Sequence, residues 1–312
     1  KLISKDKKIK SQINLIDIFI TSNNLKIDRY YNNYFLNKKF FYYIPTFVDL
    51  SLVKIMSCLL YFNKKNYIVK SQFMTFKDFL YSINFTFRVD KIKIKKIFFR
   101  KLNIKDLILR ELYLRQNLNA SIIGLQNYLF AKNLKDKKIE LRSVLNWNEN
   151  SIVDKGWNYG FRSFYENLNT FGYQGFYVEK KLSSIDVTSN ELKSKTCPEY
   201  IMIVGSILKK SRSEFAKKIK FIQSKAFRFE YLLFKKFYKK KINNKIIILL
   251  NLDKETCIEI IDKIRKTKFA KNKNTIFIKE HPLLKLSQFY HKPLPNNFKI
   301  IEGNFYDVIK KF

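Results

Sequence analysis

Glycine, proline, cysteine, tryptophan and histidine are scarce in this chain, whose 312 residues include 7 Gly, 5 Pro, 3 Cys, 2 Trp and 2 His. Most other positions hold Lys, Ile, Asn, Phe, Tyr or Leu, the bias expected when an AT-rich genome pushes tolerant positions toward a few codons. Residues of the rare types are therefore expected to be needed at their positions for structure or function. Both tryptophans and five of the seven glycines lie between Trp147 and Gly205.

The cysteines are few and far apart. Cys58, Cys197 and Cys257 form no C-x-x-C pair. This spacing supports neither a disulfide framework nor a zinc site. A reducing compartment fits best, so we expect a cytoplasmic protein.

Long apolar runs and secretion signals are also lacking. The most apolar stretch, 47–62, is interrupted by Asp49 and Lys54, and it is shorter than the ~20 residues that a membrane span needs. No signal peptide is visible. Because the chain begins with Lys1 instead of Met, we expect its N-terminus to be incomplete.

Several catalytic signatures are missing. The sequence contains no G-x-x-x-x-G-K-[ST], G-x-G-x-x-G, G-x-S-x-G or H-E-x-x-H motif. The missing motifs argue against four classes of protein, namely classical NTPases, dinucleotide oxidoreductases, serine hydrolases and zinc proteases. No cluster of Asp and Glu resembles a metal site either, so we expect no metal and no cofactor.

Acidic residues are outnumbered by basic ones, 26 to 62, which gives a formal net charge of +36. Such a charge suggests nucleic acid or an anionic membrane as a partner. The lysines are scattered through every segment, however, which favours codon bias as their cause. We expect no nucleic-acid partner, while peripheral contact with the anionic inner face of the cytoplasmic membrane and a preference for phosphate-bearing substrates stay open.

Apolar periodicity predicts an α/β protein. Helical spacing occurs over 71–85 and 103–135, and strands at 138–147 and 170–178 flank a helix that begins near Ser151. Val153, Trp157, Phe161 and Tyr165 recur every four residues and predict the buried face of that helix. Strands and helices then alternate, which is typical of a parallel sheet covered by helices. The predicted strands are 200–204, 219–223, 245–250, 275–279 and 298–302, and the predicted helices are 209–217, 227–238, 254–265 and one from 306.

A polar segment with Pro198, residues 183–199, is the best candidate for a linker. We therefore predict two domains, 1–190 and 191–312, with residues 1–65 poorly assignable. A doubly wound domain that ends at Phe312 is short, so we expect the second domain to be truncated.

Glu149 follows the predicted strand at 138–147 directly. Ligands of open α/β sheets bind at the carboxyl ends of strands, which nominates Glu149 as a general base. Asp154 is a weaker candidate, because its spacing from Ser151 is that of a capping box. Asn158 and Arg162 follow Asp154 at four-residue intervals, and this stripe either lines a sugar site or is solvated.

His281 lies directly after the predicted strand at 275–279. Beside Lys279, its imidazole could bind a phosphate or donate a proton to a departing one, although a surface-loop histidine is the alternative. Arg228, also just past a strand, is a candidate phosphate or carboxylate clamp or else a surface arginine. His291 has no comparable context.

Taken together, the motifs resemble those of bacterial surface-carbohydrate biosynthesis proteins of the capsule and lipopolysaccharide type, which look like GT-B glycosyltransferases with a His-Pro motif. The resemblance covers about residues 138–285 and is most specific between Trp147 and Phe176. The motifs are Trp147-x-Glu149-Asn150, Asp154-Lys155-Gly156, Gly160-Phe161-Arg162, Gly172-Tyr173-Gln174-Gly175-Phe176, Val204-Gly205, Phe227-Arg228-Phe229 and Lys279-Glu280-His281-Pro282.

The resemblance implies a GT-B-like fold, in which two Rossmann-like domains face a cleft. It implies a metal-independent, inverting glycosyltransferase that moves a sugar from a nucleotide-activated donor, of the CMP-linked Kdo or sialic-acid type, to a glycan or glycolipid acceptor. Residues 1–190 would form the acceptor-side domain and residues 191–312 the nucleotide-sugar domain. His281 and Pro282 would contact the donor phosphate, and Glu149 would be the base. We expect Lys279, Gly205 and Arg228 at the donor phosphate, and Asp154, Asn158, Arg162 and Gln174 at the acceptor or sugar.

Three other functions stay open. A nucleic-acid-binding protein would use the positive charge and the many Tyr and Phe rings for stacking. A catalytically inactive scaffold would keep the fold within a polysaccharide-assembly complex. A polyol-phosphate transferase would use a CDP-linked donor with the same His-Pro chemistry.

Overall fold

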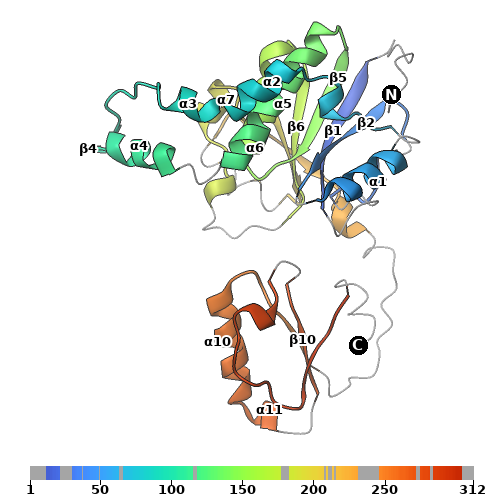
Figure 1. Ribbon diagram of the computed structural model, residues 1–312, viewed down its shortest axis with the longest axis vertical. Helices are drawn as coiled ribbons and strands as arrows, with labels where there is room; N and C mark the ends of the chain where they lie inside the picture. Colours follow the sequence, from blue (N-terminus) through green and yellow to red (C-terminus); the bar gives the residue numbers. More distant parts are fainter. Residues whose placement is uncertain are drawn as a thin grey trace. The chain divides into compact units, whose positions relative to one another are not determined.

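The computed structural model describes most of the chain as two compact units, unit 1 (Lys1–Phe234) and unit 2 (Lys235–Phe312) (Figure 1). The described residues are 12–21, 30–36, 38–48, 50–62, 66–114, 118–176, 183–206, 209, 213, 216–230, 246–271, 275–281 and 284–303.

Unit 1 is built on a parallel sheet of six strands in the order β2-β1-β5-β6-β7-β8. From the adjacent strands β1 and β5, the chain continues outward in opposite directions, to β2 on one side and to β6 on the other. Reversal of strand order between neighbours defines a topological switch point. The predicted α/β class is therefore confirmed, with a Rossmann-like sheet. The strands are β1 (Ile13–Ile20), β2 (Phe41–Phe47), β5 (Leu141–Trp147), β6 (Asn169–Gln174), β7 (Tyr200–Val204) and β8 (Lys220–Ser224).

Strand β1 lies inside the sheet, and seven of its eight residues are buried. Its sequence INLIDIFI is apolar on both faces apart from Asn14 and Asp17. Continuous apolar runs of this kind are typical of parallel strands that helices cover on both faces. The sequence predicts no element in residues 1–65, yet β1 and β2 both lie there.

The connection from β2 to β5 is long and mostly helical. The sequence predicts helices at 71–85 and 103–135, and the structure has helices in both ranges. The elements of this connection are α1 (Leu52–Phe62), η1 (Lys70–Gln72), α2 (Phe76–Ile83), α3 (Phe85–Val89), the hairpin of β3 (Phe98–Phe99) and β4 (Leu102–Asn103), α4 (Lys105–Leu114) and α5 (Leu118–Asp136).

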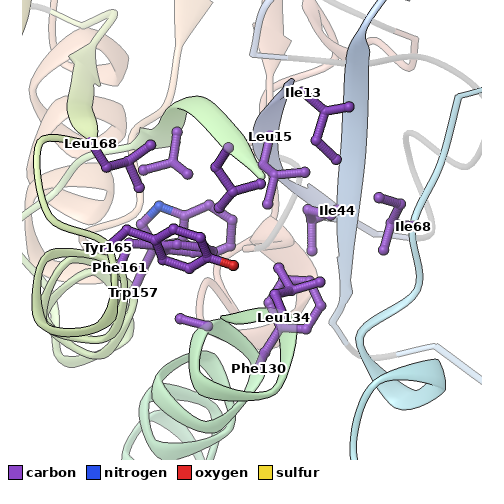
Figure 2. Packing of buried hydrophobic residues seen from close by; sticks show 13 residues of the cluster. Ile13, Leu15, Ile44, Ile68, Phe130, Leu134, Trp157, Phe161, Tyr165 and Leu168 are labelled. Carbon is purple, nitrogen blue, oxygen red and sulfur yellow. The ribbon is translucent and has the colours of Figure 1, made fainter. Parts of the chain in front are cut away.

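Helix α5 and helix α6 (Ile152–Phe164) pack against one face of the sheet. Figure 2 shows Trp157 and Phe161 on α6, Tyr165 directly after it, and Phe130 and Leu134 on α5, in the same apolar cluster as the side chains of β1. Trp157 and Phe161 are fully buried, Tyr165 is 8% exposed and Val153 is half-buried, so the predicted buried face is confirmed at three of its four positions. Full burial of such side chains contributes roughly 1.5–3 kcal/mol each.

Two glycines of α6 allow this close helix contact. A Cβ atom on Gly156 would lie 2.0 Å from the carbonyl oxygen of Gly124 in α5, and one on Gly160 would lie 2.8 Å from Tyr128 Cα. Real side chains cannot occupy that space. These glycines escape the compositional bias because the two backbones touch.

The opposite face of the sheet carries an aromatic cluster. Its rings include Tyr31, Tyr43, Trp147 and Tyr173, together with Phe227 of the short helix η3 (Phe227–Phe229). Tyr173 ties η3 to the sheet, because its hydroxyl donates to Lys225 O at 3.0 Å and accepts from Phe227 N at 3.1 Å. Both faces of the central strands are thus covered.

Unit 2 contains a parallel three-stranded sheet in the order β11-β10-β9. Helix α10 packs on it through Cys257 and Ile261, which are fully buried, and Figure 1 shows the helix alongside this sheet. The elements are β9 (Ile246–Leu249), α10 (Lys254–Arg265), α11 (Lys268–Lys271), β10 (Ile276–Lys279), η4 (Leu286–Gln288) and β11 (Phe298–Ile300). The predicted helix 254–265 has the observed bounds.

The boundary between the units differs from the predicted one at residue 190. Strands β7 and β8 pair in parallel with β6 and with each other, so they continue the sheet of unit 1. The expected linker, 183–199, lies inside unit 1 and connects β6 to β7 through η2 (Ser183–Ile185) and α7 (Ser189–Lys193). The predicted boundary is therefore corrected to 234.

Some predicted elements fall largely outside the described residues. These are the helix at 209–217, the helix at 227–238 beyond its 3-10 start, and the helix from 306.

Candidate functional site

The carboxyl ends of β1 and β5 meet at the switch point of the first sheet. Ile16 of β1 pairs with Leu145 of β5, and β5 ends at Trp147. Glu149 is an exposed residue in the loop that follows. It therefore lies where open α/β sheets bind ligands, as the sequence predicts.

Trp147 orients the carboxylate of Glu149. Its indole nitrogen donates a hydrogen bond of 2.7 Å to Glu149 Oε1. The indole is 4% exposed and packs against the rings of Tyr30 and Phe176, at centroid distances of 4.4 and 5.3 Å. A buried, packed donor holds the exposed carboxylate in one orientation, which a general base requires.

The loop after Glu149 is held in place by a polar clamp. Asn150 has a φ of 56°, in the left-handed region that Asn tolerates better than most residues. Its side-chain amide donates to the carbonyl oxygens of Ser184 and Asp186, both at 3.3 Å. Lys155 joins Asn150 to Glu191 of α7. The Glu149 loop is therefore fastened to the β6–β7 connection.

Asp154 caps α6 and is only 3% exposed. Its carboxylate accepts from the backbone N–H groups of Glu149 and Ser151 at 3.0 and 2.9 Å, from Ser151 Oγ at 3.0 Å and from Asn146 Nδ2 at 2.9 Å. Burial raises the pKa of Asp154 to about 6, although these hydrogen bonds act to lower it. The structure thus shows the capping box that the sequence leaves as an alternative.

The other residues expected at the acceptor or sugar are held inside unit 1. Asn158 is fully buried and donates to Asp154 O at 2.9 Å. Arg162 donates to Cys197 O at 2.8 Å, and Gln174, 2% exposed, donates to Ile185 O at 3.3 Å. Asp154, Asn158 and Arg162 share a face, as predicted, and that face packs against the protein.

Buried amides gather behind Glu149. Asn148 is fully buried, and neither its side-chain nitrogen nor its side-chain oxygen has a hydrogen-bond partner in the protein. The side-chain oxygens of Asn146, Asn158 and Gln174 also lack a partner. Buried polar atoms are paired in most proteins. The strand ends beside Glu149 therefore form an unusually polar interior.

In unit 2, His281 follows the central strand, β10. Lys279 Nζ donates to Glu280 O at 3.2 Å, and Leu284 N donates to His281 O at 3.1 Å. The buried carboxylate of Glu280 accepts from Leu286 N at 2.6 Å and lies 3.4 Å from Lys285 Nζ. The half-buried His281 lies two residues after the end of β10, at the carboxyl end of the sheet.

Two residues expected beside His281 lie in the other unit. Gly205, with a φ of 88°, directly follows β7, and Arg228 lies in η3 with its guanidinium 5.5 Å from the centre of the Phe229 ring. Both belong to unit 1 because β7 and β8 continue its sheet. Pro282 lies outside the described residues.

No protein-family model, curated protein or solved structure matches the chain. The resemblance to surface-carbohydrate transferases therefore stays a prediction carried by the motifs. Within the described residues, no group of three or more His, Cys, Asp or Glu side chains could hold a metal ion. No helix in that same part of the chain has the length and hydrophobicity that crossing a membrane requires.

Unit 1 also contains a buried ionic group that none of the sequence motifs indicates. Lys70 Nζ lies 2.6 Å from Thr46 Oγ1 and 3.5 Å from Asp17 Oδ1, and the side chains of Asp17 and Lys70 are 1% and 12% exposed. Burial raises the pKa of Asp17 and lowers the pKa of Lys70, because the loss of hydration outweighs their mutual attraction.

This ionic group borders a cavity of about 300 Å³. Thr46, Lys70, Ser71 and Gln126 supply polar atoms to a lining that is otherwise mainly apolar. Asp17, the lone acid in the apolar run of β1, is the sequence signal that could have revealed the group.

Proposed function

We propose that this protein is a glycosyltransferase that moves a sugar from a nucleotide-activated donor to a hydroxyl of a glycan or glycolipid. The proposal includes the GT-B-like pairing of two Rossmann-like domains and the CMP-linked donor class that the sequence motifs suggest. The observation that carries it is Glu149, an exposed carboxylate held by Trp147 at the switch point of a parallel sheet.

In the proposed reaction, Glu149 takes the proton of the acceptor hydroxyl as the oxygen attacks the anomeric carbon. The bond from this carbon to the donor phosphate breaks, and the nucleotide leaves with the electron pair. His281 and Lys279 stabilise the negative charge that develops on the leaving phosphate. The proton that Glu149 takes up therefore balances the negative charge that the departing nucleotide gains.

Asp154 supports the assignment of the acceptor to unit 1. Phosphates bind readily at helix N-termini, where backbone N–H groups are free. At the start of α6, however, Asp154 N–H already donates to Ser151 Oγ, and the carboxylate of Asp154 accepts from the N–H groups of Glu149 and Ser151 just before the helix, so a negative charge already lies at this end. An anionic donor phosphate gains little there, whereas a neutral sugar hydroxyl can still approach the exposed Glu149.

The turn after β10 supports the assignment of the donor to unit 2. Lys279 is the last residue of β10 and His281 follows it, so an ammonium group and an imidazole lie at the carboxyl end of the central strand of a parallel sheet. Nucleotides bind at this edge in open α/β folds. The carboxylate of Glu280, between Lys279 and His281, is buried and accepts from Leu286 N.

The first test is calorimetric titration of the protein with CMP, CDP, UDP and GDP. We expect one nucleotide to bind with a dissociation constant of about micromolar order, and His281→Ala to weaken this binding at least tenfold. The exposed His291→Ala is the matched control and should bind like wild type.

Preference for CDP would favour a polyol-phosphate donor over a CMP-linked sugar. Failure of all four nucleotides to bind, together with RNA binding that falls steeply with salt, would overturn the transferase in favour of a nucleic-acid-binding protein.

A further inference from the structure

The connection between β2 and β5 contains a basic segment, residues 91–105, which we call the basic arm. It holds seven Lys and Arg residues and no Asp or Glu. Apolar residues are interleaved with the cations, as in Lys91-Ile92-Lys93-Ile94-Lys95. Positive charge and apolar side chains therefore occur together in one short stretch of chain.

The tip of the basic arm is the hairpin of β3 and β4. Phe98 pairs with Asn103 and Phe99 with Leu102 in antiparallel register. Arg100, at the turn, has a φ of 56°. Figure 1 shows β4 and the following helix α4 at the margin of unit 1, away from its six-stranded sheet. The arm is thus an appendage to the sheet.

Large apolar side chains of the basic arm face solvent. Phe98 and Phe99 are each 61% exposed, and Leu102 is 70% exposed. Neighbouring residues of a strand point to opposite faces, so exposure of both phenylalanines means that unit 1 covers neither face of the hairpin. Exposed apolar side chains that are grouped in this way are typical of interaction sites.

The cations of the basic arm are exposed too. Lys91, Lys93, Lys95, Lys96, Arg100 and Lys101 all lie at the surface. With no carboxylate inside the arm to neutralise them, they attract an anionic partner. An anionic lipid surface fits both features, because rings and aliphatic chains enter the headgroup boundary while Lys and Arg remain at the phosphates.

We propose that the basic arm docks this protein on anionic lipid bilayers, with Phe98, Phe99 and Leu102 inserted and the flanking cations at the lipid phosphates. Nucleic acid would match the charge and could stack on the phenylalanines, but it offers no apolar medium for Leu102 or for the exposed Ile92 and Ile97. This docking is independent of the proposed catalysis, because it involves neither Glu149 nor His281.

The test is sedimentation of the protein with vesicles of phosphatidylcholine alone, or of phosphatidylcholine containing about one third phosphatidylglycerol. We expect binding to the anionic vesicles at least tenfold tighter than to the neutral ones, and weaker binding at high salt. No sugar donor is added, so a lack of vesicle binding would not affect the transferase proposal. A lack of nucleotide binding would likewise not affect the proposal of membrane docking.

Two variants separate the contributions of charge and apolar surface. Lys95→Glu with Lys96→Glu, and separately Phe98→Ser with Phe99→Ser, should each weaken binding to the anionic vesicles about tenfold or more. The matched control is Lys217→Glu with Lys218→Glu, an adjacent exposed pair with the same change of charge outside the arm. It should bind like wild type.

All the altered side chains are exposed, so denaturant unfolding should show wild-type stability for each variant. Equal binding to neutral and anionic vesicles, or arm variants that bind as the control does, would overturn the proposal. RNA binding or self-association that depends on the arm, without vesicle binding, would overturn it as well.

Discussion

The indole nitrogen of Trp147 lies 2.7 Å from a carboxylate oxygen of Glu149. Trp147 is buried in the aromatic cluster and Glu149 is exposed, so the hydrogen bond restricts the movement of the proposed base relative to the sheet. The second tryptophan, Trp157, is fully buried, and its indole nitrogen has no hydrogen-bond partner. The two tryptophans therefore form a natural pair of test and control.

Trp147→Phe should lower turnover about 10- to 100-fold without changing nucleotide affinity, because it removes a hydrogen bond to a charged group, which contributes roughly 1.5–3 kcal/mol. Trp157→Phe alters the core by a similar volume and removes no such bond. Steady-state kinetics of both variants, corrected for the folded fraction, checks this prediction. Equal losses of turnover in the two variants would contradict the role given to Trp147.

Gly156→Ala should destabilise unit 1 by about 2 kcal/mol or more, because its Cβ would lie 2.0 Å from the carbonyl oxygen of Gly124 and force α5 and α6 apart. Ser163→Ala, at an exposed position of the same helix, should change stability by less than about 0.5 kcal/mol. Denaturant unfolding of both variants measures the difference. Equal stability of the Gly156→Ala and Ser163→Ala variants would show that the backbones of α5 and α6 are not in close contact at Gly156.

Lys70→Met should cost about 3–5 kcal/mol at neutral pH, because it leaves the carboxylate of Asp17 buried without a cation. Combining it with Asp17→Leu removes both charges and should restore most of the lost stability. The free energies of unfolding of the single and double variants test this. A double variant no more stable than Lys70→Met would mean that the pair is not the source of the loss.

Asp154 should make the stability of unit 1 depend on pH. Its folded pKa of about 6 lies above the ordinary value of 3.8, so the native state binds the extra proton between these pH values. Its contribution is then fully present below about pH 4 and is lost as the pH rises through 6, by up to about 3 kcal/mol.

Comparison with Asp154→Asn isolates this effect, because the asparagine does not titrate. The difference in unfolding free energy, wild type minus variant, should shrink as the pH rises from 4 to 7. A constant difference across that range would mean that Asp154 is not held at a raised pKa.

Elements with a strong local signal could be predicted from the sequence. The capping box of Ser151 and Asp154 and the four-residue recurrence from Trp157 to Tyr165 define α6 closely, because helix capping and amphipathic burial depend on near neighbours. The position of Glu149 at a strand end followed from the same local pattern.

The rest depends on long-range pairing. Strand β1 is buried on both faces, so its sequence shows no alternation of apolar and polar residues. Strands β7 and β8 pair with the first sheet although a polar segment with Pro198 precedes them, and that segment suggests a domain boundary. Asp17 and Lys70 lie 53 residues apart. The roles of Asn158 and Arg162 likewise depend on what covers their face of α6, which spacing along one helix does not reveal.

The turnover of Glu149→Gln tests the proposed role of Glu149 as the general base. Nucleotide release would be measured from a nucleotide sugar of the class that calorimetry selects, with a glycolipid extract as the acceptor. Loss of a general base should lower turnover by about 10²–10⁴-fold while nucleotide affinity stays unchanged. Glu140→Gln, exposed at the opposite end of β5, is the matched control and should keep wild-type turnover. Wild-type turnover in Glu149→Gln would contradict the assignment of Glu149 as the base.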